Sequence, residues 1–229
     1  AWRHYRGIGS VQRRNSGNII TADCYFDTMN FMEMTSSIFM VIVALAAVVN
    51  GLGIVRIVGG LSELIRRRES LNISFNLIHS MLVLFQLLAH VLLWWSFIGL
   101  RDISGVNFLQ FLYLLIGPIL LYLATSLLVP DFTGTTLDMR AEYWRSCESY
   151  YTILIVFWIW SMFIWPVFGY PLAPTWKFIA CWMAIMTILR FNKNERAHQL
   201  LVSAVWFVMF LFIAIYAMQL GGVASQMAQ

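Results

Sequence analysis

The sequence predicts an all-α fold, a polytopic bundle of six helices that cross a lipid bilayer. The 229 residues are 60% hydrophobic and 11% charged, with a mean hydropathy of +0.74, whereas a soluble domain carries roughly 25% charged residues. From Ile38 onward the long apolar stretches contain no Asp or Glu, and Lys and Arg stand only at their ends. No connection is long enough for a soluble domain of about 50 residues, so we expect residues 29–229 to form one membrane domain.

Each predicted span rests on an uncharged window of the sequence. A membrane-crossing helix needs about 20 mainly apolar residues, and five windows reach this length. The window 178–189 is shorter, but it can cross if Lys177 and Arg190 extend their side chains to the lipid surface. The predicted spans are residues 35–57, 72–98, 106–129, 149–168, 173–191 and 199–220.

Charge placement orients these spans. Basic residues gather in the connections after spans one, three and five, and such connections are cytoplasmic by the positive-inside rule. Both termini then lie outside the cell. If 173–191 did not cross, the basic residues after it would lie on the opposite side, which favours six spans. The residues on the basic side are Arg56, Arg66, Arg67, Arg68, Arg140, Arg145, Arg190, Lys193 and Arg196.

Residues 1–28 do not fit the membrane pattern. They carry four arginines and lack the apolar core of a signal peptide. Residue 1 is Ala, whereas Met29, Met32 and Met34 stand directly before the first span. We expect 1–28 to be a disordered or non-native segment, with a genuine short arm as the alternative.

Local signals refine spans three and four. Pro118 lies inside span three and removes one backbone hydrogen bond, and Pro166 with the run 169–171 is expected to end span four. Thr135 and Asp138 have the spacing of a capping box, which predicts a helix that starts there and continues into span four.

Aromatic residues near span ends are typical of interfacial belts. The predicted outer belt comprises Trp94, Trp95, Trp165 and Trp176, and the predicted inner belt comprises Tyr143, Trp144, Tyr150 and Tyr151.

Span two carries a stripe of polar side chains that is the main candidate for function. Successive members are 4, 3, 7 and 4 residues apart, which keeps them on one helical face at about 100° per residue. Each unpaired group facing lipid would cost on the order of several kcal/mol, so the stripe must face the bundle interior. The stripe comprises Asn72, Asn76, His79, Gln86 and His90. Its candidate partners on other spans are Asn50, Gln110, Tyr113, Tyr122 and Thr125. Gln110 is also a candidate to line a solute path together with the stripe.

Three functions are compatible with this stripe. The first is hydrogen bonding between helices, in a non-enzymatic interaction, sensory or accessory component of the membrane. The alternative is a transporter or channel for a small solute that the stripe lines. The third is a haem-type redox protein, although His79 and His90 lie about 16 Å apart along the helix and cannot share one metal. We therefore expect no resident cofactor or metal.

Enzymatic and nucleic-acid signatures are missing from the sequence. It contains no G-x-x-x-x-G-K-[ST], H-E-x-x-H or G-x-S-x-G motif, so we expect no catalytic residues. It also lacks a basic stripe interleaved with exposed aromatics, which argues against nucleic acid. The expected partners are the lipid bilayer and either another membrane protein or a second copy of the chain.

One segment has a resemblance to known proteins. The run NFLQFLYLLIGPILLYLATSLLVPD from Asn107, followed by LDMRAEYWRSCESYY, resembles a group of uncharacterised bacterial polytopic inner-membrane proteins. In that group a Pro-containing span ends in a Pro-Asp pair, and an Arg- and Tyr-rich amphipathic segment follows it. The resemblance covers residues 107–151. It implies a bacterial inner-membrane location and no known activity.

Overall fold

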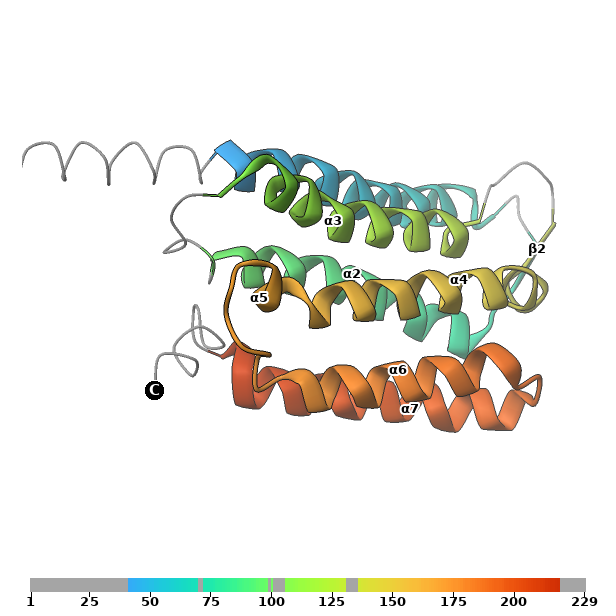
Figure 1. The fold of residues 1–229 in the computed structure, drawn as a ribbon. Helices are drawn as coiled ribbons and strands as arrows, with labels where there is room; N and C mark the ends of the chain where they lie inside the picture. Colours follow the sequence, from blue (N-terminus) through green and yellow to red (C-terminus); the bar gives the residue numbers. More distant parts are fainter. Residues whose placement is uncertain (1–40, 70–71, 99, 101–105, 131–135, 219–229) are drawn as a thin grey trace, which may run out of the picture.

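A computed structural model describes residues 41–69, 72–98, 100, 106–130 and 136–218 of the chain. In this part the backbone is almost entirely helical, with two strands of three residues each (Figure 1). Four helices are long and apolar enough to cross a membrane, which makes the protein a membrane-embedded helical protein. They are Val41–Arg67, Leu77–Ile98 (α2), Phe108–Leu128 (α3) and Glu195–Ala217, the last composed of α7 (Glu195–Phe212) and the π-helix η1 (Ile213–Ala217).

Predicted spans four and five are also helices, but one is partly polar and the other is shorter than the four apolar helices. α4 (Met139–Met162) has 24 residues, but its first half is polar, and α6 (Trp176–Phe191) has 16 residues. The first span was predicted to end at residue 57, whereas the observed helix continues to Arg67. Residues 1–28 and the first six residues of span one lie outside the described part.

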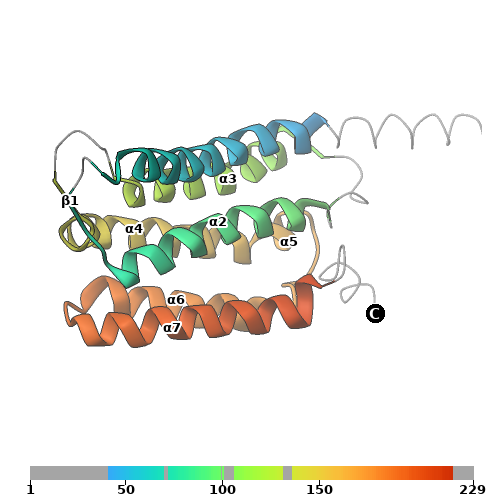
Figure 2. The same ribbon diagram turned by 180° about the vertical axis from the view of Figure 1, so that it is seen from behind.

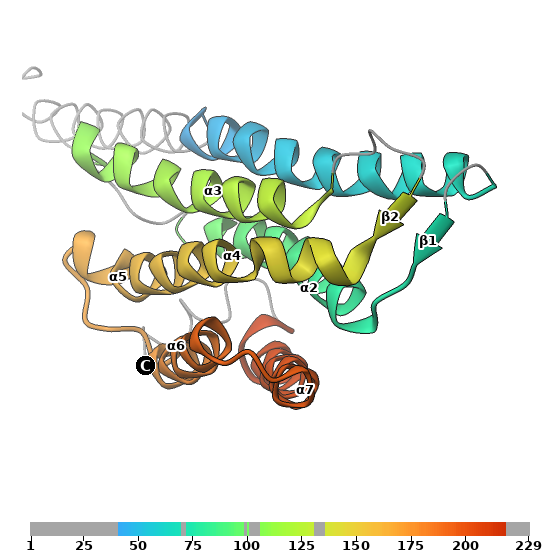
Figure 3. The same ribbon diagram turned by 90° about the vertical axis from the view of Figure 1, so that its right-hand side faces the viewer.

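The start of span two was predicted five residues too early. Residues Asn72–Ser74 form β1, which pairs in parallel with β2 (Thr136–Asp138), as Figure 3 shows. α2 begins only after Asn76, whose side-chain oxygen accepts a hydrogen bond of 3.0 Å from the backbone N–H of His79. This cap satisfies an N–H group that has no partner within the helix, which fixes the start of α2 at Leu77.

Both ends of α4 follow from individual residues. The capping-box spacing predicted a helix that starts after Thr135, but Thr136–Asp138 form β2 and the helix begins only at Met139. Asp138 is the cap instead: its carboxylate accepts from the N–H groups of Arg140 and Ala141 at 2.9 and 3.1 Å. Thr135 lies outside the described residues. At the other end, Pro166 has no N–H for the carbonyl of Met162 and its ring would collide with that carbonyl. The helix therefore ends at Met162, before the predicted 168, and the short α5 (Ile164–Val167) follows.

The helices pack as three layers of two (Figures 1 and 2). Val41–Arg67 and α3 form one outer layer, α2 and α4 the middle layer, and α6 and α7 the other outer layer. α4 contacts both α3 and α6, and α2 contacts both α3 and α7, so the middle layer holds the bundle together. These helices supply deeply buried apolar side chains, among them Leu82, Phe85, Leu121, Leu154, Met186, Leu189 and Val205.

The end of the helix Val41–Arg67, the strands β1 and β2, and residues 192–194 lie together at one end of the bundle, here called the basic end (Figures 1 and 2). Ion pairs link the elements there: Arg140 lies 2.5 Å from Glu195, and Arg190 lies 3.6 Å from Glu148. The fold therefore brings the predicted basic connections to the same end. α5 and η1 lie at the opposite end.

Candidate functional site

The buried polar side chains of α2 form the candidate site. Asn76, His79, Gln86 and His90 are all buried, and the last two are completely enclosed. Asn72 does not belong to this helical face, because it lies in β1 opposite Thr136. The predicted stripe therefore has three residues on α2, His79, Gln86 and His90, and Asn76 is the cap directly before the helix.

His90 is the centre of a junction between three helices. Its Nδ1 lies 2.7 Å from Oδ1 of Asn50, and the Asn50 amide donates back to the His90 carbonyl at 2.9 Å. Its Nε2 lies 2.8 Å from the hydroxyl of Thr125. Because an amide oxygen only accepts, Nδ1 carries the proton, and Nε2 of the neutral ring is an acceptor. The Thr125 hydroxyl has one proton to donate, and it lies within hydrogen-bonding distance of both this nitrogen and the Leu121 carbonyl, at 2.8 and 2.9 Å. Both ring nitrogens of His90 therefore have a polar partner on a neighbouring helix.

A glycine closes this junction from the side of the first helix. A Cβ at Gly53 would overlap Cε1 and Nε2 of the His90 ring, whereas a Cβ at Gly51 would meet no atom within 4 Å. Glycine at position 53 therefore lets the Val41–Arg67 backbone lie directly on the imidazole. This close approach of small residues is typical of helix contacts in membranes.

Gln86 and His79 connect α2 to its other neighbours. The Gln86 amide donates to the Leu121 carbonyl on α3 at 3.0 Å, and its oxygen accepts from the Tyr150 hydroxyl on α4 at 3.2 Å. Nε2–H of His79 donates to the Leu128 carbonyl at 2.8 Å. All three stripe residues of α2 thus bond to α3, Gln86 bonds also to α4, and His90 bonds also to the first helix.

The predicted partners divide into two groups. Asn50 and Thr125 contact the stripe, as described above. Gln110 does not join it: it forms the capping box of α3 with Asn107, and its amide donates to the Val167 carbonyl at 3.0 Å, at the end opposite the basic end. Tyr122 is more than a third exposed, and its hydroxyl forms no hydrogen bond with the stripe in the described part of the chain.

Tyr113 forms a separate clamp with Trp160. The Tyr113 hydroxyl donates to the Trp160 carbonyl at 2.6 Å, and the Trp160 indole donates to the Tyr113 carbonyl at 2.8 Å. The two rings stack with centroids 5.8 Å apart. A Cβ at Gly117 would overlap the Trp160 ring, so this glycine allows α3 and α4 to approach.

The sequence interpretation missed a tyrosine cluster at the basic end. Tyr143, Tyr150 and Tyr151 are buried rather than interfacial, so their assignment to an aromatic belt was wrong. The Tyr143 hydroxyl bonds to Nδ1 of His198 and lies 3.1 Å from the Tyr151 hydroxyl, and Nε2–H of His198 donates to the Asn192 carbonyl at 2.7 Å. Their spacing of seven and eight residues along α4 is the signal that places them on one buried face.

The residues of the predicted outer belt differ in exposure. Trp94 and Trp176 are each 43% exposed, which is compatible with an interfacial position, and the belt stays a prediction. Trp95 and Trp165 are instead half-buried and line a cavity.

The histidines are poorly disposed to bind a metal. Both ring nitrogens of His90 and of His198 already have hydrogen-bond partners, as does Nε2 of His79. Each of these nitrogens would have to release its partner before it could bind iron or zinc. No group of three or more His, Cys, Asp or Glu residues with metal-binding geometry occurs in the described residues.

No family model, curated protein or solved structure matches this chain. The resemblance of residues 107–151 to bacterial inner-membrane proteins therefore stays a prediction.

Proposed function

We propose that this protein is a non-enzymatic, six-span protein of the bacterial inner membrane, an interaction, sensory or accessory component whose α2 stripe holds its helices together. The carrying observation is that His79, Gln86 and His90 are buried and each hydrogen-bonds to a neighbouring helix. Bonds of this kind between membrane helices contribute about 0.6–2 kcal/mol each. Three such residues along α2 fix the rotation of this helix about its axis and determine which helices pack against it.

Six spans are supported by the position of α4 and α6. Both helices lie inside the same three-layer bundle as the four apolar helices and run along them (Figures 1 and 2). The polar first half of α4 and Arg190 of α6 both lie near the basic end, where Glu148 and Arg190 pair. With the basic end in the cytoplasm, both termini are outside.

The packing favours helix joining over a solute path. A path needs space beside its polar side chains, yet the cavity of about 120 Å³ between the ends of α2, α4, α6 and α7 is lined by none of His79, Gln86 and His90. Their polar atoms face backbone carbonyls and partner side chains at hydrogen-bonding distance. In this arrangement the stripe contributes stability rather than a route for water.

A comparison of His90→Leu with Val91→Leu tests this proposal. Val91 is the next residue and is 46% exposed, so its variant keeps the junction. We expect His90→Leu to lose about 1–3 kcal/mol of unfolding free energy, because the Asn50 oxygen becomes unpaired, and Val91→Leu to stay within about 0.5 kcal/mol of wild type. Osmotic swelling of proteoliposomes in glycerol, urea and ribose should match protein-free vesicles. Swelling that exceeds those vesicles and changes in His90→Leu would establish the solute path instead.

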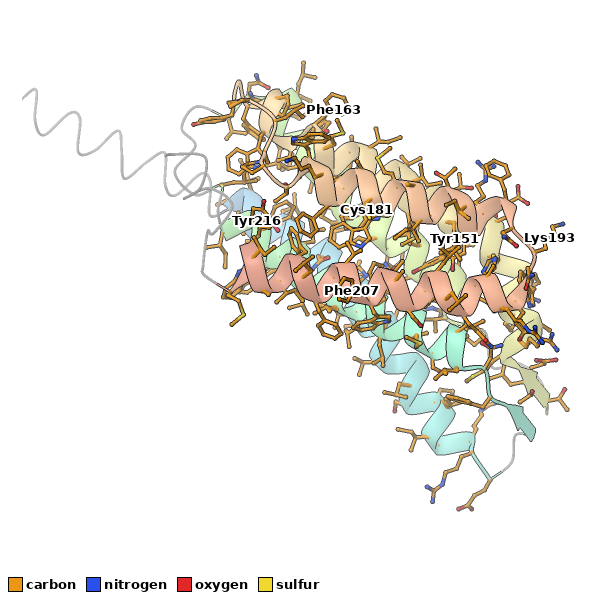
Figure 4. All side chains as sticks on the ribbon, turned by 90° about the horizontal axis from the view of Figure 1, so that it is seen from below. Tyr151, Phe163, Cys181, Lys193, Phe207 and Tyr216 are labelled. Carbon is orange, nitrogen blue, oxygen red and sulfur yellow. The ribbon has the colours of Figure 1, made fainter. Side chains whose placement is uncertain are left out.

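Cysteine labelling tests the six-span topology. Lys193 lies in the connection between α6 and α7 at the basic end (Figure 4), and Tyr170 lies between α5 and α6 and is 44% exposed. In a background with the native cysteines replaced by serine, Tyr170→Cys should react with a membrane-impermeant maleimide in intact spheroplasts. Lys193→Cys should react only after permeabilisation. The reverse pattern, or labelling of both in intact spheroplasts, contradicts the topology.

A further inference from the structure

The end of the bundle opposite the basic end contains a cavity of about 120 Å³. The ends of α2 and α4, α5, the start of α6 and the α7–η1 segment all contribute to its wall. Tyr216 lies in this wall, and Figure 4 shows it at the end of the bundle opposite to Lys193. The cavity is separate from the stripe and from the proposed function above.

The wall is aromatic and carries no charge. Trp158 and Trp182 stack with centroids 4.3 Å apart and an angle of 15° between their planes, and Phe212 packs edge-on against Trp182 at 5.4 Å. None of the side chains that line the cavity is a carboxylate, an ammonium, a guanidinium or an imidazole. A cavity of about 150 Å³ accepts a benzene ring, so this one has the scale of a single small ring.

Three hydrogen-bond donors in this wall have no partner. The indole nitrogens of Trp95, Trp158 and Trp182 are three of the four buried side-chain polar atoms without a partner in the described residues. Buried indole N–H groups normally find an acceptor. This protein supplies one elsewhere, since Trp160 donates to the Tyr113 carbonyl and Trp206 to the Met81 carbonyl. The unpaired donors are therefore concentrated at one cavity.

We propose that this cavity binds a neutral, planar ring bearing carbonyl oxygens, the chemistry of a membrane quinone head group. Carbonyl oxygens are the acceptors that the three indole donors lack, and the stacked rings of Trp158 and Trp182 match a flat ligand. A quaternary ammonium also favours aromatic surfaces, but it would leave all three donors unpaired. The apolar wall suits a molecule that arrives from the bilayer.

The shape of α7 provides an independent reason to place a site here. The helix changes to the π-helix η1 at Ile213, and Tyr216 and Ala217 of η1 line the cavity. Single π-helical turns occur frequently at functional sites. Each indole nitrogen is covered by neighbouring atoms, so a ligand reaches it only when the indole ring turns.

Calorimetric titration of the full-length protein in detergent micelles tests the proposal. The probe is a decyl-substituted 1,4-benzoquinone, and the matched ligands are decylbenzene, which lacks the oxygens, and decyltrimethylammonium. We expect saturable binding of the quinone at one site per chain and no saturable binding of the other two. Equal binding of decylbenzene would show that the acceptors do not matter. Preferred binding of the ammonium would make the cavity a cation site, and either result overturns the proposal.

Two variants and a control locate the binding. Trp182→Phe keeps the aromatic stack but removes one donor, and it should weaken quinone binding about two- to tenfold, the effect of one hydrogen bond. Trp206→Phe is the matched control, because its indole donates to the Met81 carbonyl outside the cavity, and it should bind like wild type. Ala89→Leu places a larger side chain in the wall and should abolish binding. Unchanged affinity in a folded Trp182→Phe protein would refute the role of the donors.

Discussion

The contact between Gly53 and His90 offers the sharpest test of how the bundle is held together. In Gly53→Ala the new methyl group would overlap Cε1 and Nε2 of the imidazole. The ring must then move away from Asn50 and Thr125, or the first helix must move away from α2. Gly51→Ala is the matched control, because the same change on the same helix meets no atom within 4 Å.

The expected magnitude follows from the contacts that are lost. The His90 ring makes two interhelical hydrogen bonds, and bonds of this kind average about 0.6 kcal/mol in membrane proteins. Overpacking of a close contact adds about 1–3 kcal/mol. The gain of up to about 1 kcal/mol in helix propensity from glycine to alanine is common to both variants. Gly53→Ala should therefore be about 2–4 kcal/mol less stable than Gly51→Ala.

Unfolding by sodium dodecyl sulfate in mixed micelles, followed by far-ultraviolet circular dichroism, measures this difference. The double variant Gly53→Ala/His90→Ala should recover part of the loss, because removal of the ring removes the overlap. Equal unfolding free energies for Gly53→Ala and Gly51→Ala would refute the proposed close approach. A double variant whose losses simply add would show that the glycine acts through something other than His90.

Further predictions concern the α3–α4 contact and the basic end. Gly117→Ala should destabilise the protein by about 1–3 kcal/mol in the same unfolding assay, because its Cβ overlaps the Trp160 ring. Burial raises the pKa of the Tyr143 phenol, which lies outside the predicted span, above its ordinary value of 10. Folding therefore keeps this phenol protonated, so stability should fall as the pH rises above 10, and less steeply in Tyr143→Phe. Arg140→Gln removes an exposed ion pair with Glu195 and should cost less than about 1 kcal/mol, with no difference from wild type in 1 M salt.

The spacing of the polar residues correctly predicted which face of α2 is buried. This was possible because the positions of polar residues around one helix depend only on the sequence of that helix. The face of His79, Gln86 and His90 is buried as expected. The partners depend on the register between helices, which the spacing within one helix does not contain. Thr125 contacts His90, whereas Gln110 lies at the other end of the bundle against α5.

Two errors show where local signals are ambiguous. Asn72 continues the polar spacing of α2, but backbone pairing with Thr136, distant in the sequence, places it in a strand. Tyr143 and Tyr151 lie near a span end, where both interfacial and buried aromatics occur. Two features show that these tyrosines are buried rather than interfacial: they share one face of α4, and Tyr143 bonds to His198 on another helix.

The two ends of the bundle are stabilised by different interactions, and this difference bears on function. Lipid removes most of the hydrophobic advantage of helix contact, so hydrogen bonds and close packing decide which helices associate. From the tyrosine cluster to His90, the polar groups described above pair across helices. Around the cavity, aromatic contacts dominate and the indoles of Trp158 and Trp182 lack acceptors. Such an end can change its packing for a ligand at little cost in paired hydrogen bonds. Quinone binding should therefore slow backbone hydrogen exchange in η1 and at the start of α6, and leave exchange around His90 unchanged.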